Sequence, residues 1–128
     1  MGRTTLSRIY GVICGVGLWL SFAGLAWGHA FPDHQSPGAG SVLSASPPTV
    51  QIWFDGELEP IFSTITVEDA NGHVIASGAV APGQPDPTLL QVRLPALAPG
   101  IYQVKWSVVA VDGHRTEGQY TFIFKPTP

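Results

Sequence analysis

Sulfur is nearly absent from this chain. Its 128 residues include one cysteine and one methionine, and these are Cys14 and Met1. Residues 29–128 therefore offer no disulfide and no thiolate or thioether ligand for a metal ion. A metal site in this part of the chain has to be built from nitrogen and oxygen donors, which suit a different set of metal ions from those that sulfur selects.

Basic charge is also scarce. Residues 29–128 carry all nine acidic residues of the chain but only four basic residues, Arg93, Lys105, Arg115 and Lys125, so their net charge is near −5. Proteins that bind nucleic acid rely on Lys and Arg contacts to phosphate. The charge balance therefore excludes a nucleic-acid partner held in that way, whereas it does not repel a cation.

The first 28 residues have the order of parts found in a secretory signal peptide. Arg3 and Arg8 form a short basic stretch, an uncharged apolar run extends from Ile9 to Trp27, and Ala26-Trp27-Gly28 is a small-x-small cleavage site. We predict that residues 1–28 are a cleaved signal peptide and that the protein is periplasmic. The alternative is an uncleaved membrane anchor, because the 19-residue run approaches the roughly 20 residues that span a bilayer.

Cleavage after Gly28 would make His29 the first residue of the mature chain. Its α-amine nitrogen and an imidazole nitrogen could then close a chelate ring around one metal ion. A histidine inside a chain lacks this option, because its backbone nitrogen is an amide. Under the anchor alternative His29 has no such amine.

The mature chain has the pattern of short strands separated by turns. Apolar residues alternate with polar ones, which indicates strands with one buried face, and Asn71-Gly72 predicts a hairpin turn. No stretch shows a 3.6-residue period. The predicted strands are residues 50–54, 63–68, 73–76, 90–94, 101–109 and 118–125, with an extended, proline-rich lead-in at 32–49 and a loop at 79–87.

These patterns predict an all-β fold, a small Greek-key antiparallel β-sandwich of the immunoglobulin-like or cupredoxin-like kind. Residues 29–128 have the length of one domain with one core. Trp53 and Trp106 occupy alternating strand positions, where aromatic residues are usually core. We therefore predict that both pack inside the sandwich.

A second concentration of donors is Asp112-Gly113-His114, between the last two predicted strands. In an extended chain the two outer side chains point to the same side, and Gly113 allows the backbone to bend. A carboxylate and an imidazole could thus reach one ion. By itself this triplet is a weak signal, because most such triplets are surface turns.

Other polar residues have a plain interpretation beside the metal one. Asp55, Glu57 and Glu59 follow the first predicted strand, and they read either as solvated loop acids or as an extra oxygen at the site. His34 reads as a surface histidine or as an assistant in metal capture, and His73 as turn surface. Arg115 and Glu117 are expected to hydrogen-bond to the ligand loop and orient His114.

Several motifs together resemble the CopC family of periplasmic copper-binding proteins, and the resemblance covers essentially all of residues 29–128. They are His29-Ala30, Ser36 to Gly40 leading into Val42-Leu43, Val50 to Phe54 followed by Glu57-Leu58, Gly100 to Val109, Asp112-Gly113-His114, Gly118, and Phe122 to Phe124.

The resemblance implies a small Greek-key β-sandwich that holds Cu(II) through the N-terminal histidine and the Asp-x-His motif. The ligands carried over are His29, Asp112 and His114, with one Cu(II) per chain. Cu(II) favours tetragonal sites of nitrogen and oxygen and leads the divalent affinity order. The α-amine and Nδ1 of His29, one ring nitrogen of His114 and one oxygen of Asp112 would meet that preference.

The chain also departs from part of the family. Some members have a methionine-rich loop that binds Cu(I), and no methionine remains in residues 29–128. Some members begin His-x-His, whereas the third mature residue here is Phe31. The resemblance therefore carries over only the Cu(II) site.

The predicted function is non-enzymatic. The protein would sequester Cu(II), or carry it to an acceptor such as an inner-membrane copper transporter, in copper resistance or homeostasis, and we expect a monomer. One alternative is a copper monooxygenase built on a histidine brace, although Asp112 would fill the equatorial position that such an enzyme keeps for oxygen. Another is an accessory β-sandwich in which the Asp-x-His motif is incidental. Under that alternative, removing His29 would leave any metal binding unchanged.

Overall fold

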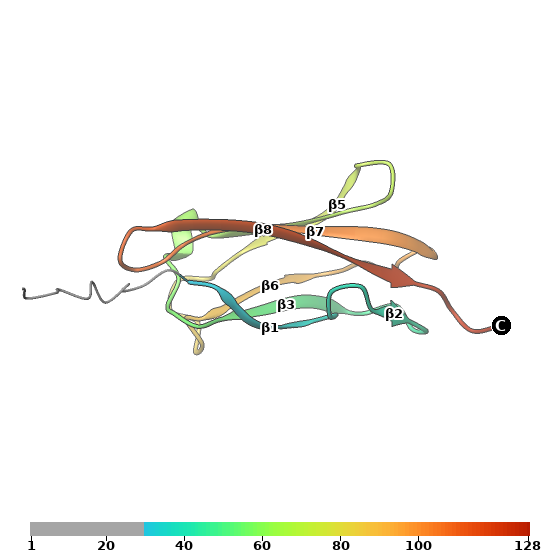
Figure 1. The fold of residues 1–128 in the computed structure, drawn as a ribbon, viewed down its shortest axis with the longest axis horizontal. Helices are drawn as coiled ribbons and strands as arrows, with labels where there is room; N and C mark the ends of the chain where they lie inside the picture. Colours follow the sequence, from blue (N-terminus) through green and yellow to red (C-terminus); the bar gives the residue numbers. More distant parts are fainter. Residues whose placement is uncertain (1–29) are drawn as a thin grey trace, which may run out of the picture.

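The computed structural model describes residues 30–128, which form two stacked β-sheets (Figure 1). One sheet has three strands in the order β1-β3-β6, and the other has five in the order β2-β8-β7-β4-β5. All pairings are antiparallel except that of β2 with β8. The predicted all-β sandwich is confirmed. The elements are β1 (Pro32–Ser36), β2 (Val42–Leu43), β3 (Thr49–Phe54), the 3-10 helix η1 (Pro60–Phe62), β4 (Thr64–Glu68), β5 (Val74–Ala79), β6 (Leu89–Arg93), β7 (Gly100–Val109) and β8 (Arg115–Phe124).

The period-2 pattern of the sequence accounts for the core between the sheets. Alternate residues of each central strand point inward and are buried, as the pleat of a strand requires. Phe54 of β3 lies edge-on to Trp106 of β7, with ring centroids 5.1 Å apart, and this contact joins the two layers. Within the five-stranded sheet, Tyr102 stacks on Phe122 at 5.5 Å. The predicted core position of Trp106 is confirmed, because only 9% of its surface is exposed.

Trp53 does not join this core, so its predicted position was wrong. It alternates with the buried residues Ile52 and Phe54 and therefore faces outward from β3. There its ring stacks on His34 of the neighbouring strand β1, with centroids 4.3 Å apart and ring planes at 10°. Strand periodicity, rather than aromatic character, decides which face a residue occupies.

Gly118 lets the indole of Trp106 lie across β8. The two residues are paired in the β7–β8 register, and a Cβ atom at residue 118 would be 2.3 Å from Cζ2 of Trp106. Any side chain larger than hydrogen would therefore push the indole away. This contact forms part of the core beneath the end of the β7–β8 hairpin.

The observed strands differ from the predicted ones chiefly at their ends. The proline-rich lead-in contains β1 and β2, which periodicity did not reveal. β1 begins at Pro32 and pairs only with β3, as expected for proline at the start of an edge strand. β5 extends to Ala79, and β8 begins at Arg115 because it pairs with β7 along its whole length. Within residues 30–128 no helix is long and apolar enough to cross a membrane.

Candidate metal centre

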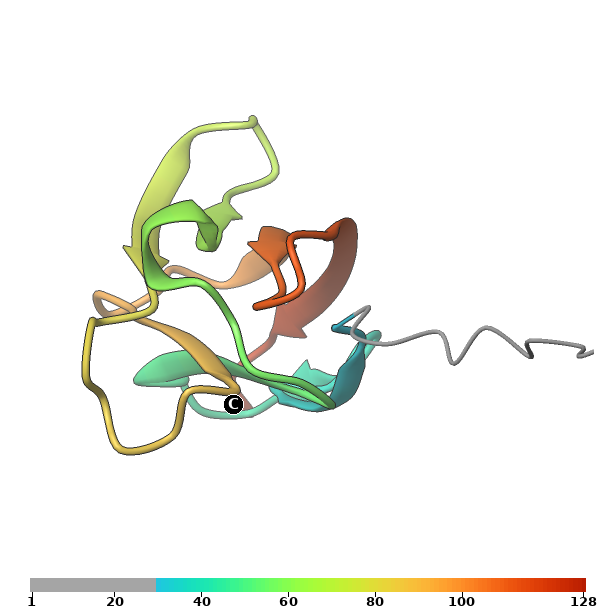
Figure 2. The same ribbon diagram turned by 90° about the vertical axis from the view of Figure 1, so that its left-hand side faces the viewer.

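One end of the sandwich gathers three segments that are far apart in the sequence (Figure 2). They are the first described residues, the connection from β3 to η1, and the loop between β7 and β8. The backbone N–H of Val111 donates to the carbonyl of Glu57 at 3.2 Å, and that of Glu59 donates to the carbonyl of Val109 at 2.7 Å. These bonds fix the β7–β8 loop against the segment that follows β3.

A buried serine supports the base of this loop. Ser63, fully buried at the end of η1, accepts a hydrogen bond from the backbone N–H of Val109 at 3.2 Å. Val109 is the last residue of β7. The strand end that carries the loop is thus held from the side of η1 as well as by its own sheet.

The loop itself, residues 110–114, is a tight hairpin connection. The N–H of Ala110 donates to the carbonyl of His114 at 2.9 Å, and the N–H of Gly113 donates back to the carbonyl of Ala110 at 2.8 Å. Gly113 has φ +91°, a conformation that side-chain-bearing residues rarely adopt. The predicted bend at this glycine is confirmed.

Asp112 and His114 face each other within the loop. Oδ1 of Asp112 accepts the backbone N–H of His114 at 3.0 Å, and Oδ2 lies 2.9 Å from Nδ1 of the His114 ring. The carboxylate side chain is 22% exposed and the imidazole 59%. An ionised carboxylate only accepts hydrogen bonds, so it favours the tautomer with hydrogen on Nδ1 and the lone pair on Nε2.

The start of the described chain is fastened beside this pair. The backbone N–H of Phe31 donates to Oδ1 of Asp55 at 2.8 Å, and the N–H of Asp55 donates to the carbonyl of Phe31 at 2.9 Å. The hydroxyl of Thr116 donates to the carbonyl of Ala30 at 2.7 Å. Since Thr116 is two residues after His114, the fold brings the beginning of the domain to the Asp-x-His loop.

The predicted ligand His29 lies outside the residues that the structure describes. The structure therefore bears on two of the three predicted ligands, Asp112 and His114, and brings them into contact. Across residues 30–128 there is no cluster of three or more His, Cys, Asp or Glu side chains suited to hold a metal ion. A site with more than these two protein ligands would need donors from another part of the chain.

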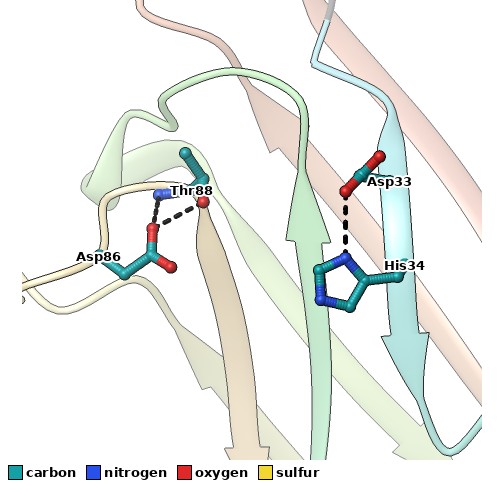
Figure 3. A network of polar contacts seen from close by, with 4 residues as sticks. All are labelled: Asp33, His34, Asp86 and Thr88. Atoms are coloured by element: carbon teal, nitrogen blue, oxygen red, sulfur yellow. Dashed lines mark hydrogen bonds and ion pairs between the residues drawn. The ribbon is translucent and has the colours of Figure 1, made fainter.

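The remaining candidates have other contacts. Asp55 is engaged with Phe31, while Glu57 and Glu59 contribute backbone hydrogen bonds to the loop. His34 lies on β1, where Nδ1 is 3.1 Å from Oδ2 of Asp33 (Figure 3). It is not grouped with Asp112 and His114. His73 sits at the β4–β5 turn beside Asp69, 78% exposed, as predicted for turn surface.

Arg115 was expected to hydrogen-bond to the ligand loop, and its observed hydrogen bond lies elsewhere. Its guanidinium donates to the hydroxyl of Ser107 at 2.6 Å, across β7 and β8, and the residue that orients His114 is Asp112. Strand pairing explains the difference, because Arg115 is already part of β8 and follows its pleat. Sequence reasoning also missed Thr116, whose bond to Ala30 spans 86 positions and leaves no local signal.

Known proteins of similar sequence point to one family. The family model described as the CopC domain matches residues 33–125. Among curated proteins, the chain is 36% identical over 100 residues to Protein YobA of Escherichia coli strain K12, covering 77% of this chain and 81% of YobA. It is also 29% identical over 98 residues to the copper transport protein CutJ of Bacillus subtilis, covering 76% of this chain but 18% of CutJ.

Solved structures give the same result. The crystal structure of CopC from Methylosinus trichosporium OB3b superposes with a TM-score of 0.73 at 37% identity, covering 78% of this chain and 97% of that one. PcoC, a copper resistance protein from Escherichia coli, superposes with a TM-score of 0.60 at 31% identity, covering 74% and 99%. Both identities are high enough for the likeness to extend beyond the fold alone.

Proposed function

This chain belongs to the CopC family, and on that premise we propose that it is a periplasmic protein that binds one Cu(II) ion per monomeric chain. Its association with copper follows from the family, which includes a copper resistance protein and a copper transport protein. Proteins of this family carry copper and are not enzymes, so the monooxygenase alternative is set aside. The oxidation state, the ligands and the stoichiometry are what we propose here.

The observation that carries the proposal is the contact between Asp112 and His114 at the end of the sandwich where Ala30 is fastened. In this arrangement the imidazole of His114, in contact with the carboxylate of Asp112, lies two residues from Thr116, which bonds to the start of the domain. A mature chain beginning at His29 would bring an α-amine and a second imidazole to the same end. The proposed donors are these two groups of His29, a ring nitrogen of His114 and an oxygen of Asp112.

The chemistry of this donor set suits Cu(II). Nitrogen and oxygen ligands in a tetragonal arrangement favour it over the other divalent ions of its row. A carboxylate has about four lone-pair positions, so one that accepts hydrogen bonds from a histidine can coordinate a cation as well. Because no sulfur is present in residues 29–128, the set has no soft ligand with which to retain Cu(I).

We further propose that the protein hands its copper to an acceptor in copper resistance or homeostasis, such as an inner-membrane copper transporter. The similarity to CutJ supports this, because there the matched segment is a small part of a much longer copper transport protein. A domain joined to a transport protein in one chain is consistent with a separate domain that serves one. The exposed imidazole of His114 is accessible for such a transfer.

The experiment is a Cu(II) titration of the purified mature protein, monitored by calorimetry and by electron paramagnetic resonance. We expect one equivalent per chain and a spectrum of nitrogen and oxygen ligation. Affinity should fall as the pH decreases below about 8, because an α-amine with an ordinary pKa of about 7.7–8.0 takes up a proton that competes with the metal.

The matched control is the same protein with an acetyl group on the α-amine of His29. It keeps every side chain but turns the α-amine of His29 into an amide, so binding should weaken by at least about a hundredfold. Equal affinity in the two proteins would show that the amine is not a ligand. Absence of Cu(II) binding to the mature protein would refute the proposed function as a whole.

A further inference from the structure

We propose that Thr116 and Asp55 are positioning residues for copper, a clamp that holds the start of the mature chain where its donors meet Asp112 and His114. The inference rests on the proposed function and concerns two residues that are not themselves proposed ligands. It is carried by hydrogen bonds from side chains of two different elements to the main chain of two consecutive residues. These are the bonds of Thr116 to Ala30 and of Asp55 to Phe31.

The clamp has three bonds. The Thr116 hydroxyl donates to the Ala30 carbonyl at 2.7 Å, Asp55 Oδ1 accepts from the Phe31 N–H at 2.8 Å, and the Asp55 N–H donates to the Phe31 carbonyl at 2.9 Å. Thr116 belongs to β8 of the five-stranded sheet, whereas Asp55 directly follows β3 of the three-stranded sheet. The clamp therefore ties the first residues to both layers of the sandwich.

The burial of Ala30 explains why its carbonyl needs the hydrogen bond from Thr116. Ala30 is fully buried as part of the hydrophobic core, so its carbonyl is remote from solvent and needs a partner inside the protein. Thr116 supplies that partner. A chain terminus is ordinarily among the least ordered parts of a domain unless something ties it down, and here the second mature residue is tied down by a side chain from the ligand hairpin.

The consequence for the metal is geometric. Consecutive Cα atoms are about 3.8 Å apart, so fixing Ala30 limits the space that the residue before it can explore. A chelating residue held near its partner ligands binds with less loss of conformational entropy than one on a free end. Thr116 and His114 are neighbours on one hairpin, which couples the position of the terminus to that of the ligand loop.

The test separates positioning from ligation and from simple stability. In Thr116→Val the hydroxyl is replaced by a methyl group of similar shape, and Asp55→Ala removes the acceptor of the Phe31 N–H. We expect each variant to bind Cu(II) about tenfold more weakly in competition with a chromophoric chelator, since one lost hydrogen bond of this kind has that effect. The paramagnetic resonance spectrum of the loaded variants should match that of the wild type, because the ligands are unchanged.

Conservative variants at the same positions should restore affinity. Thr116→Ser keeps a hydroxyl, and Asp55→Asn keeps an oxygen that can accept the Phe31 N–H while removing the charge. If Asp55 acted as a copper ligand or through its charge, Asp55→Asn would bind as weakly as Asp55→Ala and would alter the spectrum. That outcome would overturn the clamp assignment for Asp55.

Ser46→Ala is the control for stability. Ser46 accepts the backbone N–H of Leu97 at 2.9 Å, a long-range side-chain bond that joins the connections leading into β3 and β7, at the opposite end of the sandwich. Urea unfolding of the copper-free proteins would show comparable losses for Ser46→Ala and Thr116→Val. Only Thr116→Val should lose affinity; equal affinity losses in both would mean that Thr116 acts through stability alone.

A double-mutant cycle with an N-terminally acetylated His29→Ala protein, which lacks both proposed donors of residue 29, completes the test. If Thr116 works by positioning that residue, Thr116→Val should cause no further loss of affinity once His29 has been replaced. A tenfold loss that persists in the His29→Ala background would overturn the inference. If the wild type itself binds no Cu(II), the proposed function fails; if the wild type binds and every clamp variant binds equally well, only the clamp fails.

Discussion

Two aspartate–histidine pairs of this protein make nearly the same contact in very different surroundings. Nδ1 of His114 lies 2.9 Å from the carboxylate of Asp112, and Nδ1 of His34 lies 3.1 Å from that of Asp33. The two imidazoles are 59% and 60% exposed. By distance and by exposure of the ring, the pairs are almost indistinguishable.

They differ in what surrounds the carboxylate and in what the ring touches. Asp112 is 22% exposed and also accepts the backbone N–H of His114, so the loop fixes its orientation. Asp33 is 69% exposed, and the ring of His34 lies flat on Trp53. An aspartate next to a histidine is therefore no metal site by itself. Two features set Asp112–His114 apart: the second hydrogen bond that orients the carboxylate and the bond from Thr116 of the same hairpin to Ala30.

The largest expected effect comes from removing the two imidazoles separately. In His114→Ala the Cu(II) affinity should fall by at least about a hundredfold. Loss of a residue that is hydrogen-bonded to a ligand already lowers metal affinity by about 10- to 100-fold, and loss of the ligand itself should lower it further. His34→Ala should leave the affinity unchanged. Competition titrations on both variants decide the matter, and equal losses would show that the two pairs act together.

A smaller effect is expected from the carboxylates. Asp112→Asn should weaken Cu(II) binding by about 10- to 100-fold, because the amide neither carries the charge nor fixes the same tautomer of His114. Asp33→Asn is the matched control and should bind as the wild type does. Calorimetric titration would measure both, and a normal affinity in Asp112→Asn would remove Asp112 from the site.

A third pair, Asp69 with His73, provides a test by pH rather than by metal. The hydrogen bond from the backbone N–H of His73, followed by that from Asn71, lowers the pKa of Asp69 below its usual value. A lowered pKa in the folded state contributes stability above the unfolded value of about 3.9, and this is lost as pH falls through the folded value.

Asp69→Asn should therefore be less stable than the wild type at pH 6, with the difference shrinking as the pH falls below the unfolded value of about 3.9. Urea unfolding across that range would measure it, while Cu(II) affinity at neutral pH should not change. A stability difference that is constant with pH would mean that the charge of Asp69 is irrelevant to these hydrogen bonds.

The smallest effect concerns the stack of His34 on Trp53. Aromatic pairs contribute about 0.5–1.5 kcal/mol beyond the area they bury, and an exposed pair belongs at the lower limit, so His34→Ala should cost about 0.5 kcal/mol. Unfolding followed by tryptophan fluorescence would detect this change. A loss of several kcal/mol would instead place His34 in a structural role comparable with that of the core.

Much of the fold could be predicted from local pattern. The alternation of Val50, Ile52 and Phe54 and the inward residues of β7 specify buried faces, and Gly113 specifies a bend in the ligand loop. Prediction failed in two places, each for its own reason. Trp53 was assigned to the core by residue type although its strand position faces outward, and β1 was hidden because an edge strand that begins at proline has little periodicity of its own.

At the candidate metal site, the local contact could be predicted from the sequence and the long-range contact could not. Asp112 and His114 could be found in the sequence because two residues of spacing across a glycine bring their side chains together, and the contact between them is local. The clamp could not be found, because Thr116 and Ala30 are 86 positions apart and neither residue type suggests a ligand or a partner.

By itself the sequence determined the chemistry that this protein can perform: nitrogen and oxygen donors without sulfur, acidic surroundings, strands with one apolar face, and a carboxylate beside an imidazole. Only the tertiary structure decided that the distant pair Asp112–His114, and not Asp69–His73, is brought to the start of the domain. The physical reason is that donor type is a property of single residues, whereas proximity depends on how two sheets pack and on which strand ends meet.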